Sequence, residues 1–250
     1  MWSKLTSTGE RRVPKRSEFY PVGFAFVICA VASLLLASVS QGLKPIQELN
    51  MGLDLKKNIL RAVKLTPPIP PHATPREVTQ IYTEAIQLAV IDDQGNIVPG
   101  KKPDDIKGQK GLYPMFIYQK GGTVQGYCFP IEGKGLWSML YGYISIEPDG
   151  KTVRGITFYR EGETPGLGGE IEALWFQKDF EGKKIWDDAR QQTVPLAVAK
   201  GKVQDRMPKE KWPYYVDGIS GATLTGKGVS ALLENWIRTY EPFFMKLHRN

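Results

Sequence analysis

The first apolar pattern in the chain is an unbroken run. Residues 20–39 read YPVGFAFVICAVASLLLASV and contain no charged side chain. About 20 apolar residues form a helix long enough to cross the roughly 30 Å hydrocarbon core of a bilayer. The run therefore predicts a transmembrane helix over residues 20–39.

The pattern changes after this run. Residues 45–64 place leucine, isoleucine and valine among charged side chains at helical spacing, which predicts a helix that continues away from the membrane. Residues 66–71 read TPPIPP, and their prolines remove most of the backbone donors that a helix or a sheet needs. We therefore expect a helical connector over residues 40–65 and a folded domain over residues 66–250.

Apolar spacing predicts a helix near each end of this domain. Thr74-Pro75-Arg76-Glu77 has the form of a capping box with proline in the first turn, and apolar residues then recur at steps of three and four as far as Ala89. The same spacing from Val229 to Tyr240 predicts a second amphipathic helix, which Pro242 is expected to end.

The segments between these helices are typical of strands. Four short apolar stretches are separated by turns that contain glycine or proline, and they cover residues 115–118, 126–131, 141–147 and 153–159. Residues 148–151 (PDGK) predict a hairpin turn between the last two stretches. The sequence thus predicts an α+β fold class, in which one N-terminal transmembrane helix is followed by a single domain outside the cytoplasm.

The charge adds an orientation to this picture. The 250 residues carry a formal net charge of +7, and five lysines and arginines against two glutamates lie before residue 20. Basic residues stay on the cytoplasmic side of a membrane helix, so residues 1–19 are expected in the cytoplasm and the chain after Ser40 outside it. We expect membrane lipid around the helix. We expect no nucleic-acid partner, because no basic stripe with interleaved aromatics follows.

A cleaved signal peptide is an alternative reading of the same segment. Ser38 and Ser40 have the small side chains of a cleavage site. The apolar region of a signal peptide is usually about 7–15 residues long, however, and this run is longer. The length therefore favours an uncleaved anchor.

Few residues could bind a metal. The chain has two cysteines, Cys29 and Cys128, and two histidines, His72 and His248, all far apart in the sequence. Zinc and haem sites need such residues at paired spacings. We therefore expect no metal site.

The segment with the clearest chemistry is DGISGATLTG, residues 217–226, which lies just before the C-terminal helix. Small residues allow a tight turn there, and the free N–H groups at the start of a helix favour a phosphate. Thr223 and Thr225 add hydroxyl groups, and Asp217 adds a carboxylate. The plain alternative is that Ser220, Thr223 or Thr225 only caps the helix.

The pattern Asp-x-x-Ser-Gly-Ala-Thr resembles the flavinylation signature of bacterial FMN-binding domains. In this chain it consists of Asp217, Ser220, Gly221, Ala222 and Thr223. The resemblance implies that FMN is attached covalently, through its phosphate, to Thr223. It also implies a separate flavin transferase that uses FAD and Mg²⁺ and recognises Asp217 and Ser220, with Gly221 keeping the turn accessible.

Two further motifs extend the resemblance, GKGLW at residues 133–137 and ETPGLG at residues 163–168. With the basic N-terminus and the single span, their order is similar to that of the C-subunit family of Na⁺-translocating NADH:quinone oxidoreductases. The related G subunit of the Rnf electron-transport complex is the alternative. The likeness implies that Thr164, Gly166 and Leu167 contact the flavin and that Trp137 stacks on it. Without the likeness, the loop would be a plain turn and Trp137 a core residue.

The resemblance also implies the function. It describes a protein in the inner membrane of a bacterium, with its main domain in the periplasm, as part of a six-subunit sodium pump. Its FMN relays electrons from an iron–sulfur centre toward the second covalent FMN, on the neighbouring B subunit, and toward quinone. It implies no catalytic residue on this chain and no activity of the chain alone. The alternative from another class is an anchored scaffold without a cofactor, because no nucleophile–histidine–carboxylate set is visible.

Overall fold

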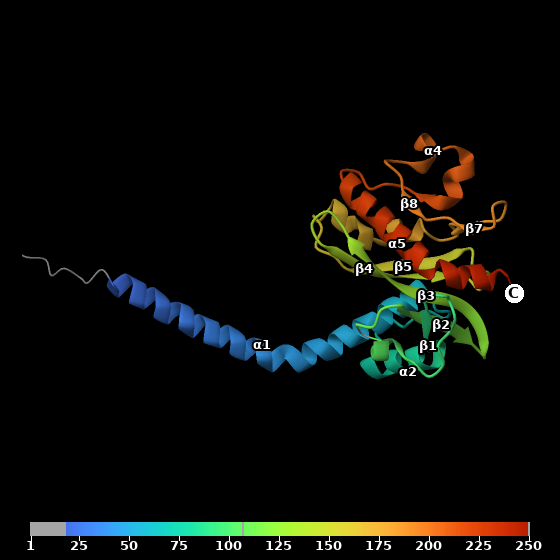
Figure 1. Cartoon of the computed structure of the whole chain (residues 1–250). Helices are drawn as coiled ribbons and strands as arrows, with labels where there is room; N and C mark the ends of the chain where they lie inside the picture. The colour runs from blue at the N-terminus through green and yellow to red at the C-terminus, as the bar shows by residue number, and fades with distance from the viewer. Residues whose placement is uncertain (1–18, 107, 250) are drawn as a thin grey trace, which may run out of the picture. The chain divides into compact units, whose positions relative to one another are not determined.

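A computed structural model describes residues 19–106 and 108–249. Its first element is one long helix, α1 (Phe19–Ala62), of 44 residues (Figure 1). At 1.5 Å per residue this helix is about 66 Å long, roughly twice the hydrocarbon core. An 18-residue window of it reaches a mean hydropathy of 2.6, and none of that window is buried. Among the described residues, α1 is the one helix long and apolar enough to cross a membrane.

The predicted α+β fold class is confirmed. A five-stranded antiparallel sheet has the order β1-β2-β3-β4-β5, so neighbours in sequence are neighbours in space. Its strands are β1 (Ile86–Asp92), β2 (Leu112–Lys120), β3 (Thr123–Lys134), β4 (Met139–Ile146) and β5 (Val153–Arg160). The turn at residues 148–151 joins β4 to β5 as predicted, with Gly150 at φ 66°.

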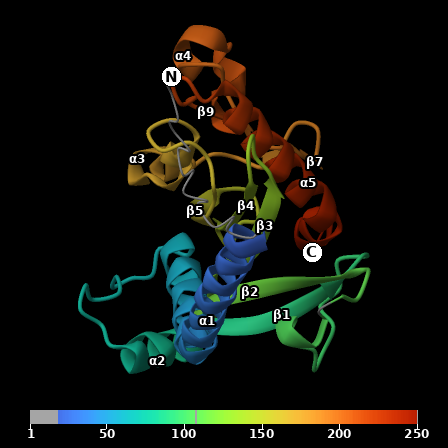
Figure 2. The same ribbon diagram turned by 90° about the vertical axis from the view of Figure 1, so that its left-hand side faces the viewer.

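One face of the sheet packs against the C-terminal helix α5 (Thr223–Leu247), which lies along β3 (Figure 2). Phe129 is fully buried at the centre of this core. Its ring lies 4.6 Å from that of Tyr240 and 5.5 Å from that of Phe244, measured between centroids. Aromatic rings at this separation stabilise each other beyond the area they bury.

The other face of the sheet is covered as well. Successive side chains of a strand point to opposite faces of the sheet, and Phe116 and Tyr143 point to this second face. They form a second core with Leu60 near the end of α1, with Val63 just after it, and with Val78 of α2 (Pro75–Ala85). Residues 51–250 form one compact unit. The last turns of α1 are therefore buried as part of the domain that follows it.

Two predicted helix ends are wrong. The helix expected to reach Ala89 ends at Ala85. The backbone becomes extended at Ile86, and residues 86–92 pair with β2 along their whole length. The predicted capping box itself is confirmed by hydrogen bonds in both directions between Thr74 and Glu77. At the other end, α5 passes through Pro242 to Leu247, since the phenylalanines at 243 and 244 remain buried in the core.

The chain between β5 and α5 consists of short elements. They are η2 (Gly168–Glu172), α3 (Leu174–Lys178), β6 (Trp186–Asp187), β7 (Gln192–Thr193), β8 (Ala197–Val198), α4 (Val203–Arg206), η3 (Lys209–Tyr214) and β9 (Tyr215–Val216). Among them, α3 packs on β5, and β8 packs on α5. One further short helix, η1 (Pro103–Ile106), precedes β2.

Candidate functional site

A cavity of about 170 Å³ brings the three sequence motifs together. Its walls come from the turn before β4, from the loop after β5 and from the start of α5. The lining residues are Leu136, Glu163, Thr164, Leu167, Gly168, Gly221, Ala222, Thr223, Leu224 and Thr225. Segments that lie far apart in the sequence therefore share one small hollow.

The start of α5 forms one wall of this cavity and has no side-chain cap. Its N-cap residue is Ala222, which makes no side-chain hydrogen bond. The first bond of the helix is the one that the N–H of Gly226 donates to the carbonyl of Ala222. The N–H groups of residues 223–225 come before that bond and have no helical acceptor, so this end of the helix can bind an anion. The plain reading, that a serine or threonine caps it, is wrong.

The two threonines at this end differ in what their hydroxyls do. Thr225 is 2 % exposed, and its Oγ1 donates a 2.7 Å hydrogen bond to Oε2 of Glu163. Thr223 is exposed and lines the cavity. Of the two hydroxyls, only that of Thr223 is available to an incoming group.

The carboxylate of Glu163 holds the three motifs together. Besides the bond from Thr225, it accepts backbone N–H bonds from Leu136 at 3.2 Å, Trp137 at 2.9 Å and Ser138 at 3.1 Å. Glu163 itself is buried. We call these five residues the Glu163 clamp. It joins the turn before β4 to the loop after β5 and both of them to the start of α5.

The clamp keeps Glu163 ionised. Burial disfavours the charge and raises the pKa of the carboxyl group, but the hydrogen bonds from Thr225, Trp137, Ser138 and Leu136 outweigh burial. The pKa of Glu163 therefore lies below its ordinary value of 4.5. Because the folded pKa is lowered, the ionised clamp stabilises the fold above about pH 4.5 and loses that effect as the pH falls through the folded value.

The glycines of the motifs allow the segments to approach closely. A Cβ on Gly168 would lie 2.5 Å from Oγ1 of Thr225 and 2.9 Å from Cβ of Glu163. A Cβ on Gly135 would lie 2.5 Å from Oε1 of Glu163, and one on Gly228 would lie 2.7 Å from a backbone carbonyl oxygen. These contacts are shorter than a Cβ normally makes. Close packing around Glu163 therefore explains the glycines at 135 and 168, and close approach to the backbone at Lys134 explains Gly228.

We predict that Gly168→Ala lowers the free energy of unfolding by about 2 kcal/mol, because the added methyl group must push Thr225 away from Glu163. Gly169→Ala is the matched control, since a Cβ there would meet its nearest atoms at 3.4 Å, and we expect a change of about 0.5 kcal/mol or less. Urea denaturation measures both. Equal effects of the two substitutions would contradict the close-packing explanation.

Not all of the expected cofactor-contacting residues line the cavity. Gly221, Ala222, Thr223, Thr164 and Leu167 do. The remaining expected residues, which are absent from its lining, are Asp217, Ser220, Gly166 and Trp137.

Asp217 has a different set of contacts. Its carboxylate accepts a 2.7 Å ion-pair bond from Nζ of Lys202 and a 2.8 Å bond from the N–H of Val203. Burial raises the pKa of Asp217, but Lys202 and the backbone bond outweigh it and hold the pKa below its ordinary value. Asp217 thus fastens the start of α4 beside the signature.

Trp137 is not a core residue. Its side chain is 71 % exposed, and its backbone N–H belongs to the clamp. Leu136, Leu167 and Leu224, which line the cavity, are also well exposed. Single exposed leucines are ordinary on protein surfaces, but apolar side chains gathered around one hollow are typical of a surface that a ligand or partner covers. The cavity is therefore bordered by apolar surface that a flat, apolar group could cover.

The arrangement fits the phosphate end of FMN. The cavity volume of about 170 Å³ is below the range of about 300–1,000 Å³ that is usual for sites enclosing a whole small molecule. The cavity would therefore enclose one end of FMN and leave the rest on the surface. The uncapped helix start suits the phosphate, and the exposed apolar residues suit the isoalloxazine ring. No group of three or more potential metal ligands occurs in the part of the chain that the structure describes.

Local sequence patterns do not reveal the role of two residues at this site. In the sequence, Glu163 is only the first letter of a loop motif, and Thr225 is only a possible cap. The signal that could point to Glu163 is an acidic residue beside a glycine-rich loop, where backbone N–H groups are exposed. Its partners are 25 or more positions away, however, and no local pattern identifies them.

The chain is similar to known flavin-binding proteins. A family model described as FMN-binding domain matches residues 135–238, which contain all ten residues that line the cavity. The C subunit of the Na(+)-translocating NADH-quinone reductase of Yersinia pestis is 32% identical over 248 residues, covering 88% of this chain and 90% of the relative. The C subunit of the same reductase from Neisseria meningitidis serogroup A is 35% identical over 256 residues, covering 90% and 93%.

Solved structures show the same likeness. The crystal structure of the C subunit of the Na(+)-translocating NADH-quinone reductase from Parabacteroides distasonis superposes with a TM-score of 0.67 at 32% sequence identity. The match covers 81% of this chain and 96% of that one. The crystal structure of NqrC from Shewanella oneidensis gives a TM-score of 0.61 at 26% identity, covering 78% of this chain and 97% of that one.

Proposed function

Because the chain belongs to the C-subunit family of Na(+)-translocating NADH-quinone reductases, we propose that it carries electrons on an FMN attached covalently, through its phosphate, to Thr223. When bound, FMN supplies carrier chemistry for one or two electrons. In this proposal the FMN stands between an iron–sulfur centre of the complex and the FMN of the B subunit, on the way to quinone. The alternative assignment to an Rnf G subunit is not favoured, since the relatives compared above carry the other name.

The observation that carries this proposal is the contrast between Thr223 and Thr225. Both follow the same uncapped turn, but Glu163 occupies the hydroxyl of Thr225, and Thr223 faces the cavity with an exposed side chain. A phosphate esterified to Thr223 would lie next to the free N–H groups at the start of α5. This chain would bind and orient the group, and the helix end would stabilise its charge.

The attachment itself needs a second enzyme. A flavin transferase that uses FAD and Mg²⁺ would form the bond between Oγ1 of Thr223 and the phosphorus of the FMN half, and AMP would leave. Gly221, at φ 76°, holds the turn that exposes Thr223 to such an enzyme. Asp217 and Ser220 would belong to the surface that the transferase recognises.

We extend the proposal to topology. Residues 1–19 would lie in the cytoplasm, and residues 20–39 would cross the bacterial inner membrane once. Residues 40–65 would be a helical connector whose last turns pack into the domain, and residues 66–250 would form the rest of the periplasmic FMN-binding domain. The basic residues before the span support this orientation. The partners would be the other members of the six-subunit complex, the transferase during maturation, and membrane lipid.

The test is the colour and redox behaviour of the full chain, purified from a host that supplies the flavin transferase. We expect a yellow protein whose visible flavin absorption bleaches on chemical reduction and returns with oxygen, and which does not oxidise NADH alone. A colourless protein from that host would contradict the proposal and would favour an anchored scaffold.

A further inference from the structure

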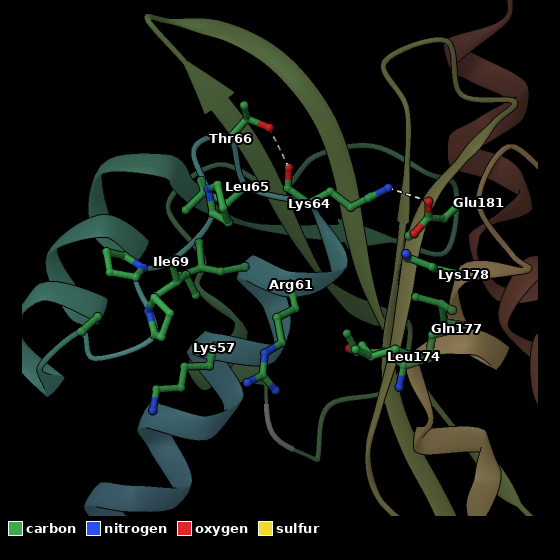
Figure 3. Close-up of a pocket in the computed structure, with 18 residues that line it drawn as sticks. Lys57, Arg61, Lys64, Leu65, Thr66, Ile69, Leu174, Gln177, Lys178 and Glu181 are labelled. Atoms are coloured by element: carbon green, nitrogen blue, oxygen red, sulfur yellow. Dashed lines mark hydrogen bonds and ion pairs between the residues drawn. The ribbon is translucent and has the colours of Figure 1, made fainter.

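A second cavity lies away from the flavin site. It is a groove of about 610 Å³, with the end of α1 and the proline-rich segment on one side and α3 on the other (Figure 3). The buried side chain of Leu60 belongs to its lining, and the prolines at 68, 70 and 71 form part of one wall. Proline fixes its own backbone angle, so this wall is preformed.

The groove is strongly cationic. Lys57 and Arg61 lie one helical turn apart at the end of α1, Lys64 follows in the turn after the helix, and Lys178 faces them from α3. Its one carboxylate, that of Glu181, is already bonded to Nζ of Lys64 at 2.6 Å. Within residues 19–106 and 108–249, the side chains of Lys57, Arg61 and Lys178 have no ion-pair partner.

Glu181 offsets Lys64 alone, and no carboxylate of the groove lining pairs with Lys57, Arg61 or Lys178. Like charges one helical turn apart destabilise a helix by about 0.2–0.5 kcal/mol per pair. Lys57 is also half-buried. An anion that enters the groove would meet several cations with no competing internal partner and would relieve their mutual repulsion.

The occupant must also be partly apolar. Leu174 projects from α3 into the groove lining and is 76 % exposed, and Leu65 and Ile69 lie on the opposite wall. A free inorganic anion would leave these side chains in water. An apolar side chain next to acidic ones would cover them and add affinity in proportion to the area buried.

The groove belongs to the domain and not to the predicted span. Its lining begins at Lys57, 18 residues beyond Val39, the last residue of the predicted span, and lies within the compact unit of residues 51–250. A lipid headgroup in the groove is an outcome that the cross-linking experiment below distinguishes from a protein segment.

We propose that this groove is a docking site for an acidic segment, carrying at least one apolar side chain, of another protein of the same complex. The proposal rests on the proposed function, because membership of a multi-subunit reductase is what supplies such a partner. In this proposal the cations of the groove bind another subunit of the complex, and electron transfer takes place at the separate site that contains Thr223.

The experiment uses the whole complex, purified through an affinity tag on a different subunit. In the triple variant Lys57→Glu, Arg61→Glu and Lys178→Glu, we expect the amount of this chain that co-purifies to fall at least tenfold, and wild-type retention to weaken as salt rises. The matched control reverses three exposed cations elsewhere, Lys102→Glu, Lys110→Glu and Arg206→Glu, with the same change in net charge. We expect it to co-purify like the wild type.

The fluorescence of the attached flavin separates this proposal from the previous one. The groove variant should keep the flavin on its own band, since none of the three residues lines the cavity at Thr223. The docking proposal is overturned if the groove variant co-purifies in the same amount as the wild type. It is also overturned if the control variant co-purifies as poorly as the groove variant. A wild-type chain without flavin would instead contradict the proposed function.

A second measurement does not depend on whether the charge-reversal variants fold. A photoreactive amino acid in place of Leu174 leaves every cation unchanged and sits on an exposed position. We expect irradiation of the complex to join this chain to an acidic peptide of another subunit, identified by mass spectrometry. Adducts with lipid only, or no adduct, overturn the proposal.

Discussion

Thr223→Val is expected to remove covalent flavin completely. Valine has nearly the shape of threonine but no hydroxyl, so the phosphoester cannot form, and the exposed position makes a change in stability of more than about 0.5 kcal/mol unexpected. On a denaturing gel under ultraviolet light, the wild-type chain should fluoresce near 28.0 kDa, and the variant should give a dark band of equal protein.

Thr225→Val provides the comparison. It is expected to retain some fluorescence, because the proposal places the flavin on Thr223. Loss of the bond from Thr225 to Glu163 should nevertheless reduce stability. A fluorescent Thr223→Val band together with a dark Thr225→Val band would reverse the assignment of the two threonines.

Glu163→Ala is expected to have the largest effect on stability among substitutions at the site. It removes the common acceptor of Leu136, Trp137, Ser138 and Thr225, and leaves donors without partners next to a new void. Each buried donor left unpaired costs on the order of 1–3 kcal/mol, and some donors will find water. We expect the free energy of unfolding to fall by about 3 kcal/mol and the covalent flavin content to fall several-fold.

The control for this prediction is Glu132→Ala, which removes an exposed carboxylate from the neighbouring strand β3 and should change stability by about 0.5 kcal/mol or less. Acid titration adds a second readout. The pKa of Glu163 is lowered in the fold, so the stability difference between the wild type and Glu163→Gln should be present above about pH 4.5 and shrink as the pH falls. A difference that does not change with pH would contradict an ionised clamp.

The sequence predicts those parts of the fold that depend on local patterns. The uncharged run over residues 20–39, the Thr74 capping box and the hairpin at residues 148–151 all act through neighbours in the chain. The extent of α2 and α5 could not be predicted in this way. Pairing with β2 makes residues 86–92 a strand, and aromatic burial carries α5 past Pro242, and both effects depend on distant residues.

Some parts of the candidate site can likewise be predicted from local sequence, and others depend on distant residues. The signature at residues 217–223 is contiguous and visible as a pattern, and so is the glycine-rich loop. The Glu163 clamp joins residues up to 62 positions apart. Trp137 shows the limit most clearly, because composition favours a buried tryptophan and the structure leaves most of its side chain in solvent.

Mass spectrometry of the peptide that contains Thr223, from the full chain matured with flavin transferase, tests the central claim most directly. We expect this peptide to be heavier by the mass of FMN less one water, with fragment ions that place the addition on Thr223. An unmodified peptide from yellow protein, or an addition on Ser220 or Thr225, would contradict the account.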